Sequence, residues 1–113
     1  MSNQAPPVTF GSINEQNVYT ALGRAKIDFA FQVPLDGGRN VRGGQVVDFI
    51  VYVPPRPIAL YVQGKHWHGG KMALDDEYKH NRAQQMGFET MDITEDESAS
   101  VKLVTQWIRK NIL

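Results

Sequence analysis

Two hydrophobic periods follow one another at the start of the chain. In INEQNVYTALG (13–23), apolar residues recur at helical spacing directly behind a Ser-x-x-Glu capping box. This pattern predicts a helix over about residues 13–23, with Gly23 at its end. The next segment, KIDFAFQV (26–33), alternates apolar and other side chains, as a half-buried strand does. Its apolar face consists of Ile27, Phe29, Phe31 and Val33.

The middle of the chain is apolar on both faces. VVDFIVYV (46–53) lacks the alternation of a half-exposed strand, so it predicts a central strand that is covered on both sides. PPRP then leads into a second apolar run, IALYV (58–62). Because the connection is short, we expect these two strands to be neighbours.

Helical spacing returns in the second half. Apolar and charged positions predict a helix over about residues 73–86 that ends at Gly87, followed by a short strand, FETMDI (88–93). A second capping box, Thr94 to Glu97, precedes a final helix with an apolar stripe. The stripe consists of Val101, Val104, Ile108 and Ile112.

The predicted order is helix, three strands, helix, strand, helix. It fits an α/β fold with a central four-stranded mixed β-sheet flanked by helices. The first three strands would be antiparallel, and the fourth would be added through a helical crossover. We expect one domain over residues 12–113, because 113 residues suffice for a single core, behind a flexible lead-in at residues 1–11.

The composition excludes disulfides and cysteine-based zinc sites, and it indicates where the protein is expected to reside. Without cysteine the chain has no disulfide and no thiolate zinc site. It has no apolar run long enough for a membrane span, and its polar start is unlike a signal peptide, so we expect an intracellular, cytoplasmic protein. A formal net charge of zero argues against coating nucleic acid by bulk attraction.

The charges are unevenly distributed along the chain. Residues 39–71 contain one acid, Asp48, whereas residues 75–97 hold eight of the twelve acids. The basic stretch is a candidate surface for phosphates, and dispersal of its charges by the fold is the alternative. Its cations are Arg39, Arg42, Arg56, Lys65 and Lys71.

Asp48 is unusual inside an apolar strand. A buried carboxylate is costly unless it is paired, hydrogen-bonded or metal-bound. On the neighbouring strand, alternation places Tyr61, Gln63 and Lys65 on one face. A carboxylate, an amide oxygen and a lysine gathered there would suit a Mg²⁺ site that hydrolyses a phosphodiester. A structural hydrogen bond from a loop or an arginine is the alternative for Asp48.

The segment KHWHGG adds further candidates. His66 and His68 would share a strand face, but without a clear third ligand they make a weak zinc site. His68 instead suits a general acid or base near a phosphate, oriented by Asp76, for which helix electrostatics is the alternative. Trp67 is either a core anchor or a ring that stacks on bases. His80 is expected at the surface.

Together these segments resemble a known nuclease family. VVDFIV, YVQGKHWH and DDEYKHNRAQQMGFETMDI, over about residues 44–93, resemble the very short patch repair endonucleases and their relatives in the PD-(D/E)XK superfamily. The resemblance implies a restriction-endonuclease-like fold in which Asp48 binds Mg²⁺. Gly64, Trp67 and His68 match the family's HGxxWH pattern, which implies that His68 acts near the phosphate with Asp76, and that Trp67 wedges into the DNA stack.

Two departures open an alternative register. The family's first histidine is Gln63 here, which can ligate a hard metal but transfers no proton, and the family's structural zinc site is absent. In the alternative, Gln63-Gly64-Lys65 is a QxK version of the superfamily's ExK, with Glu15 supplying a carboxylate from the first helix. Archaeal-type Holliday junction resolvases, which are small homodimers, use that arrangement.

We therefore expect a Mg²⁺- or Mn²⁺-dependent endonuclease that acts on DNA, with branched or junction DNA as a candidate substrate and a homodimer as a candidate assembly. The alternative is a nuclease-fold protein that acts as a DNA-binding or assembly subunit, in which Gln63 marks the loss of an acidic site. The expected catalytic residues are Asp48, Gln63, Lys65, His68, Glu15 and Asp76, of which Asp48, Gln63 and Glu15 are the expected metal ligands. The expected DNA contacts are Arg39, Arg42, Trp67, Lys71 and Arg82.

Overall fold

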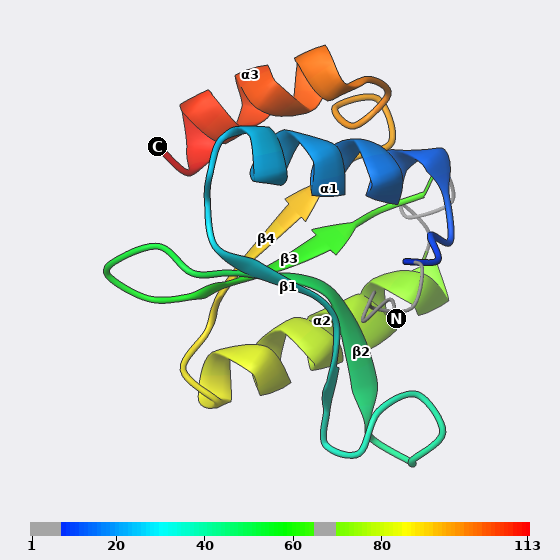
Figure 1. Ribbon diagram of the computed structural model, residues 1–113. Helices are drawn as coiled ribbons and strands as arrows, with labels where there is room; N and C mark the ends of the chain where they lie inside the picture. The colour runs from blue at the N-terminus through cyan, green and yellow to red at the C-terminus, as the bar shows by residue number, and fades with distance from the viewer. Residues whose placement is uncertain (1–7, 65–69) are drawn as a thin grey trace, which may run out of the picture.

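The protein folds into one mixed sheet with helices on both faces (Figure 1). The computed structural model describes residues 8–64 and 70–113, and for residues 70–73 the backbone alone. None of the helices in these segments is long and apolar enough to cross a membrane. The elements are α1 (Ile13–Arg24), β1 (Phe29–Leu35), β2 (Gln45–Val51), β3 (Ile58–Val62), α2 (Gly70–Gln85), β4 (Glu89–Ile93) and α3 (Val101–Asn111).

The sheet has the predicted topology. Its strand order is β1-β2-β3-β4; β2 is antiparallel to both β1 and β3, whereas β4 is parallel to β3. The parallel pair is joined by α2, as a parallel connection requires a crossover. The α/β class, the four-stranded mixed sheet and the element order are therefore confirmed.

Two clusters of buried side chains hold the layers together. In Figure 1, α1 and α3 cover one face of the sheet and α2 covers the other. β2 contributes to both layers, because Phe49 packs with α1 and α3 whereas Ile50 packs with α2, as its doubly apolar sequence predicts. We call these groups the α1/α3 cluster and the α2 cluster. The α1/α3 cluster includes Val18, Leu22, Phe49, Val51, Leu60, Ile93, Val104, Trp107 and Ile108, and the α2 cluster includes Leu35, Val47, Ile50, Ala59, Tyr61 and Ala83.

In the strand pair β1–β2, the face of the sheet on which paired side chains lie changes between two successive pairs. The paired residues Phe31 and Phe49 pack on the α1/α3 side, with ring centroids 5.0 Å apart. The next pair, Val33 and Val47, packs in the α2 cluster instead. The prediction of Val33 on the same face as Phe31 was therefore wrong. The cause is the intervening Gln32, whose left-handed φ of 54° breaks the alternation.

Two helix starts also differ from the prediction. The capping box forms, because the Thr94 N–H donates to Glu97 Oε1 (3.0 Å) and the Glu97 N–H donates to Thr94 Oγ1 (3.2 Å). It closes a turn rather than opening α3, whose N-cap is Ser100. α2 begins at Gly70, three residues before the predicted start at 73.

Asn17 joins α1 to the turn before α3 through a buried hydrogen bond. Its Nδ2 donates to the Ser98 carbonyl oxygen at 2.9 Å. We expect Asn17→Ala to lower the free energy of unfolding by about 1–3 kcal/mol, because it leaves that buried carbonyl without its donor. Urea unfolding measures the loss, and Gln16→Ala, at an exposed position of the same helix, is the control. Equal stability of the two variants would contradict the assignment.

Candidate metal and phosphate site

The candidate site lies where β2 and β3 separate. Their paired residues end at Phe49 and Leu60, so Asp48 and the end of β3 lie beyond the paired region. Asp48 spans this opening, since its Oδ2 accepts a 2.8 Å hydrogen bond from the Val62 backbone N–H. Its other carboxylate oxygen has no hydrogen-bond partner among the described residues. Asp48 also lies at the level of Gln32, where the β1–β2 pair turns over.

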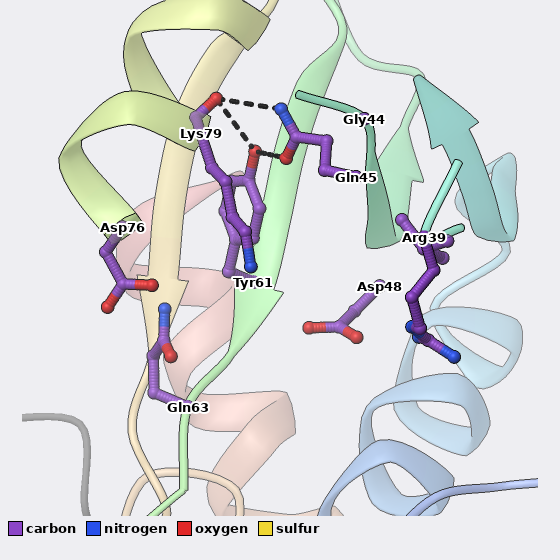
Figure 2. A pocket seen from close by; sticks show the side chains of 9 residues that line it. Arg39, Gly44, Gln45, Asp48, Tyr61, Gln63, Asp76 and Lys79 are labelled. Carbon is purple, nitrogen blue, oxygen red and sulfur yellow. Dashed lines mark hydrogen bonds between the residues drawn. The ribbon is translucent and has the colours of Figure 1, made fainter. Parts of the chain in front are cut away.

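A pocket of about 320 Å³ surrounds the Asp48 carboxylate (Figure 2). It brings together three of the predicted catalytic residues, Asp48, Gln63 and Asp76, which come from β2, the end of β3 and α2. Arg39, predicted to contact DNA, also lines it. We call this cavity the Asp48 pocket. Its lining residues are Arg39, Gly44, Gln45, Val46, Asp48, Tyr61, Gln63, Asp76 and Lys79.

The loop between β1 and β2 brings Arg39 to the pocket. Gly44 is required at its base, because a Cβ there would collide with the carbonyl oxygen of Gly38. The charge of Arg39 reaches Asp48 and acts to lower the pKa of that carboxyl. Arg39, an expected DNA contact, is therefore positioned on the same pocket as Asp48.

Burial dominates the electrostatics of Asp48. It raises the pKa of the Asp48 carboxyl to about 6, and the negative charge of Glu15 on α1 adds to the rise. The Val62 N–H and the cations Arg39 and Lys79 act in the opposite direction. A carboxylate that titrates close to neutral pH beside two cations and a polar pocket is the kind of group that concentrates at functional sites.

A hydrogen-bond network holds α2 against the pocket. The Tyr61 hydroxyl donates to Gln45 Oε1 at 2.9 Å, and Gln45 Nε2 donates to the Lys79 carbonyl oxygen at 3.0 Å. Burial, followed by the charges of nearby aspartates, raises the pKa of Tyr61, so its hydroxyl stays a donor. In Figure 2 the Lys79 ammonium group points into the pocket below this network.

The sequence reasoning missed Gln45 and Lys79. A signal for Lys79 existed, because Asp76, Lys79 and Ala83 are spaced three and four residues apart and so lie on one face of a helix. Ala83 is fully buried, which turns that face toward the sheet. Gln45 carried no comparable signal, since its role depends on the approach of α2.

Asp76 places an unsatisfied oxygen at the pocket. Its Oδ2 is buried and has no hydrogen-bond partner in the described part of the chain. Buried polar atoms in folded proteins nearly always have a partner, so this oxygen calls for a cation or a donor from outside the described residues. Its predicted partner, His68, lies outside the described residues.

Gln63 and His80 meet at Asp92 on β4. Gln63 Nε2 donates to Asp92 Oδ1 at 2.6 Å, and His80 Nε2 lies 3.1 Å from the same oxygen. His80 is partly buried, with 19% of its side chain accessible, so the expectation of a surface position was wrong. The ring packs against Tyr61 at a centroid distance of 4.6 Å. The hydrogen bond to Asp92 raises the pKa of His80.

The other predicted residues are placed as follows. Lys65, Trp67 and His68 lie outside the described residues, as does the side chain of Lys71. Arg42 is exposed on the β1–β2 loop.

Arg82 has a structural partner. Its Nε and Nη2 donate to the Asp36 carboxylate at 2.8 and 3.1 Å. This bidentate pair ties α2 to the end of β1, which is a role that the DNA-contact prediction did not include.

The donor set at the pocket fits a hard cation. Asp48, Asp76 and Gln63 present oxygen atoms only, which Mg²⁺ and Mn²⁺ prefer, whereas zinc favours nitrogen and sulfur. Mg²⁺ needs only one or two carboxylates when substrate phosphate and water complete its shell. Within residues 8–64 and 74–113, no three His, Cys, Asp or Glu side chains gather around one point. A cation here would therefore depend on the Gln63 amide as well as the two aspartates.

Comparison with known proteins gives no match: no family model, no curated protein and no solved structure is significantly similar to this chain. The function is therefore argued from the chemistry of the Asp48 pocket itself.

Proposed function

We propose that the protein is a metal-dependent endodeoxyribonuclease of the PD-(D/E)XK type and that the Asp48 pocket is its active site. One observation carries the proposal. A carboxylate with a raised pKa lies where two antiparallel strands separate, and the same pocket receives an oxygen donor from the second strand and a lysine from the next helix. Oxygen ligands beside cations suit the metal-dependent hydrolysis of a phosphodiester.

Asp48, Asp76 and Gln63 would hold Mg²⁺ or Mn²⁺. The ion supplies Lewis acidity and lowers the pKa of a bound water. Asp76 Oδ2 and the second carboxylate oxygen of Asp48, neither of which has a hydrogen-bond partner within residues 8–64 and 74–113, support this assignment. Glu15 does not line the pocket, but its charge acts on Asp48, which supports a secondary role in handling water or a second ion.

Arg39 and Lys79 would bind the scissile phosphate. Both line the pocket from opposite sides, one from the β1–β2 loop and one from α2. Cations fixed around a transferring phosphate stabilise the charge that builds up in the transition state. Arg42, exposed on the same loop as Arg39, would extend the contact along the DNA backbone. Lys65 and His68 keep the phosphate-facing roles that the family resemblance implies.

DNA cleavage in the presence of a divalent ion tests the proposal. The substrates are a four-way junction, a flap and a supercoiled plasmid, each with Mg²⁺, Mn²⁺ or EDTA. We expect at least one substrate to be cut with Mg²⁺ or Mn²⁺ and none with EDTA. Asp48→Ala should abolish cutting. Asp96→Asn, which removes an acid at an exposed turn position, should leave cutting unchanged. Size-exclusion chromatography on the same sample tests whether the active form is a homodimer.

A second candidate is a DNA-binding or assembly subunit without catalysis. It is favoured by Gln63, which stands where an acidic ligand would strengthen metal binding and whose amide nitrogen is already engaged by Asp92. The cleavage experiment separates the two, because a subunit of this kind would bind the junction or flap and cut no substrate with either ion.

A further inference from the structure

Asp92 determines which way the Gln63 amide faces. The contact between Gln63 and Asp92 Oδ1 is 2.6 Å long, so it is a close hydrogen bond. A carboxylate only accepts hydrogen bonds, whereas an amide has one donating and one accepting end. The NH₂ group of Gln63 must therefore face Asp92, and its carbonyl oxygen must face away. Figure 2 shows the Gln63 side chain at the edge of the pocket. Asp92 is not among the residues that line the pocket.

Asp92 is itself held in place from α2. His80 Nε2 lies 3.1 Å from the same oxygen that accepts from Gln63, and the imidazole is packed against the Tyr61 ring. β4 also pairs with β3 at this level, since Asp92 is the register partner of Tyr61. Two donors and a sheet register thus fix the Asp92 carboxylate, and through it the amide of Gln63.

We propose that Asp92 is a positioning residue that presents the Gln63 carbonyl oxygen to the metal ion of the Asp48 pocket. The inference rests on the proposed function. The ExK pattern has an acid where this chain has Gln63. In this chain the acid is Asp92 on the neighbouring strand β4, and it orients the neutral ligand Gln63 instead of binding the ion itself. Gln63 is then a working ligand and not the remnant of a lost site.

The pair should respond to charge in a specific way. Gln63→Glu places a carboxylate against Asp92 Oδ1, and the two like charges repel one another. Asp92→Asn removes the acceptor-only partner, so the Gln63 amide loses its fixed orientation. The double variant Gln63→Glu/Asp92→Asn restores one carboxylate and one amide in exchanged positions. The amide then donates to the carboxylate, whose second oxygen faces the pocket.

Mn²⁺ affinity, measured by isothermal titration calorimetry without DNA, tests the proposal. Loss of a residue that orients a metal ligand typically weakens affinity about 10- to 100-fold. We expect each single variant to bind Mn²⁺ at least about tenfold more weakly than wild type, and the double variant to bind within a few-fold of wild type. Glu89→Gln, an exposed acid on the same strand, should bind as wild type. Circular dichroism and thermal unfolding verify that each variant is folded.

A second readout reports the orientation directly. In ¹⁵N–¹H NMR spectra the Gln63 side-chain NH₂ signals should move on Asp92→Asn and stay in place on Glu89→Gln. Equal Mn²⁺ affinity of wild type and both single variants, or a double variant as weak as the singles, would overturn the positioning role alone. A wild-type protein that binds no Mn²⁺ and cuts no DNA would instead overturn the proposed function on which it rests.

Discussion

Asp48→Asn is expected to stabilise the fold at pH 8 and to abolish metal-dependent cleavage. Burial raises the pKa of Asp48 from 3.8 to about 6 in the folded protein, so the folded state binds this proton more tightly than the unfolded chain does. The contribution of Asp48 to the free energy of unfolding is therefore highest below about pH 4, and this contribution is lost as the pH rises through about 6. At pH 8 the ionised carboxylate costs the fold about 1–3 kcal/mol, which an asparagine avoids.

The asparagine keeps the structural contact of Asp48. Its amide oxygen can accept from the Val62 N–H as the carboxylate does, at the same position and with nearly the same volume. Under the proposed function, catalysis would nevertheless be lost, because a metal ion held by a charged ligand would contribute several kcal/mol to transition-state stabilisation, or a rate change of about 100-fold or more.

Urea unfolding at pH 4 and pH 8, in EDTA, measures the stability effect. Asp48→Asn should raise the free energy of unfolding by about 1–3 kcal/mol at pH 8 and by much less at pH 4. Asp96→Asn, on the exposed turn before α3, is the control and should show no such gain at pH 8. A loss of stability at pH 8 would show that Asp48 serves the fold, and the same gain at both pH values would show that its ionisation is not the cause of the cost.

A gain in stability on Asp48→Asn at pH 8 would show that the ionised Asp48 carboxylate destabilises the fold, which favours a functional role for the Asp48 pocket. A largely buried charge that destabilises the native state, and for which the described residues supply one backbone donor, is not explained by folding. Perturbed groups of this kind gather at active sites, where part of the stability is given up for chemistry. Asp76 Oδ2 on α2, which is buried without a hydrogen-bond partner among the described residues, is likewise a cost to the fold that a functional role would explain.

The fold could be predicted because its signals are local. Period-2 and helical spacing located the helices and strands of the described residues to within about three residues, except for the start of α3, and the doubly apolar β2 indicated a central strand. The errors arose where one backbone angle or one hydrogen bond overrides the pattern. Gln32 turns the β1–β2 pair over, and the Thr94–Glu97 capping box closes a turn ahead of the true N-cap.

The candidate site was predictable only where a residue is out of place in its own segment. Asp48 was found because a carboxylate is unusual in an apolar strand, and Gln63 because it continues the polar face of β3. Arg39 and Arg82 looked alike in the sequence, yet one lines the pocket and the other pairs with Asp36, because the path of the β1–β2 loop decides between them. That path is a long-range property that no local pattern reports.

Lys79→Met is expected to lower the rate of cleavage by about 100-fold while leaving the fold intact. The ammonium group points into the Asp48 pocket, where it would stabilise the negative charge of the transferring phosphate. Removal of one such group commonly costs 100-fold or more. The fold should tolerate the change, because Gln45 and Tyr61 bind the backbone carbonyl oxygen of Lys79, which the substitution keeps.

The pH dependence separates this role from a general effect of charge on DNA binding. The charge of Lys79 helps to lower the pKa of Asp48, so its removal should shift the acidic limb of the rate–pH profile to higher pH. Lys79→Arg should retain most of the rate and the profile. Lys102→Met, at an exposed position of α3 on the opposite face of the sheet, should change neither. Cleavage by Lys79→Met at the wild-type rate, with an unshifted profile, would leave Arg39 as the cation that binds the phosphate in the pocket.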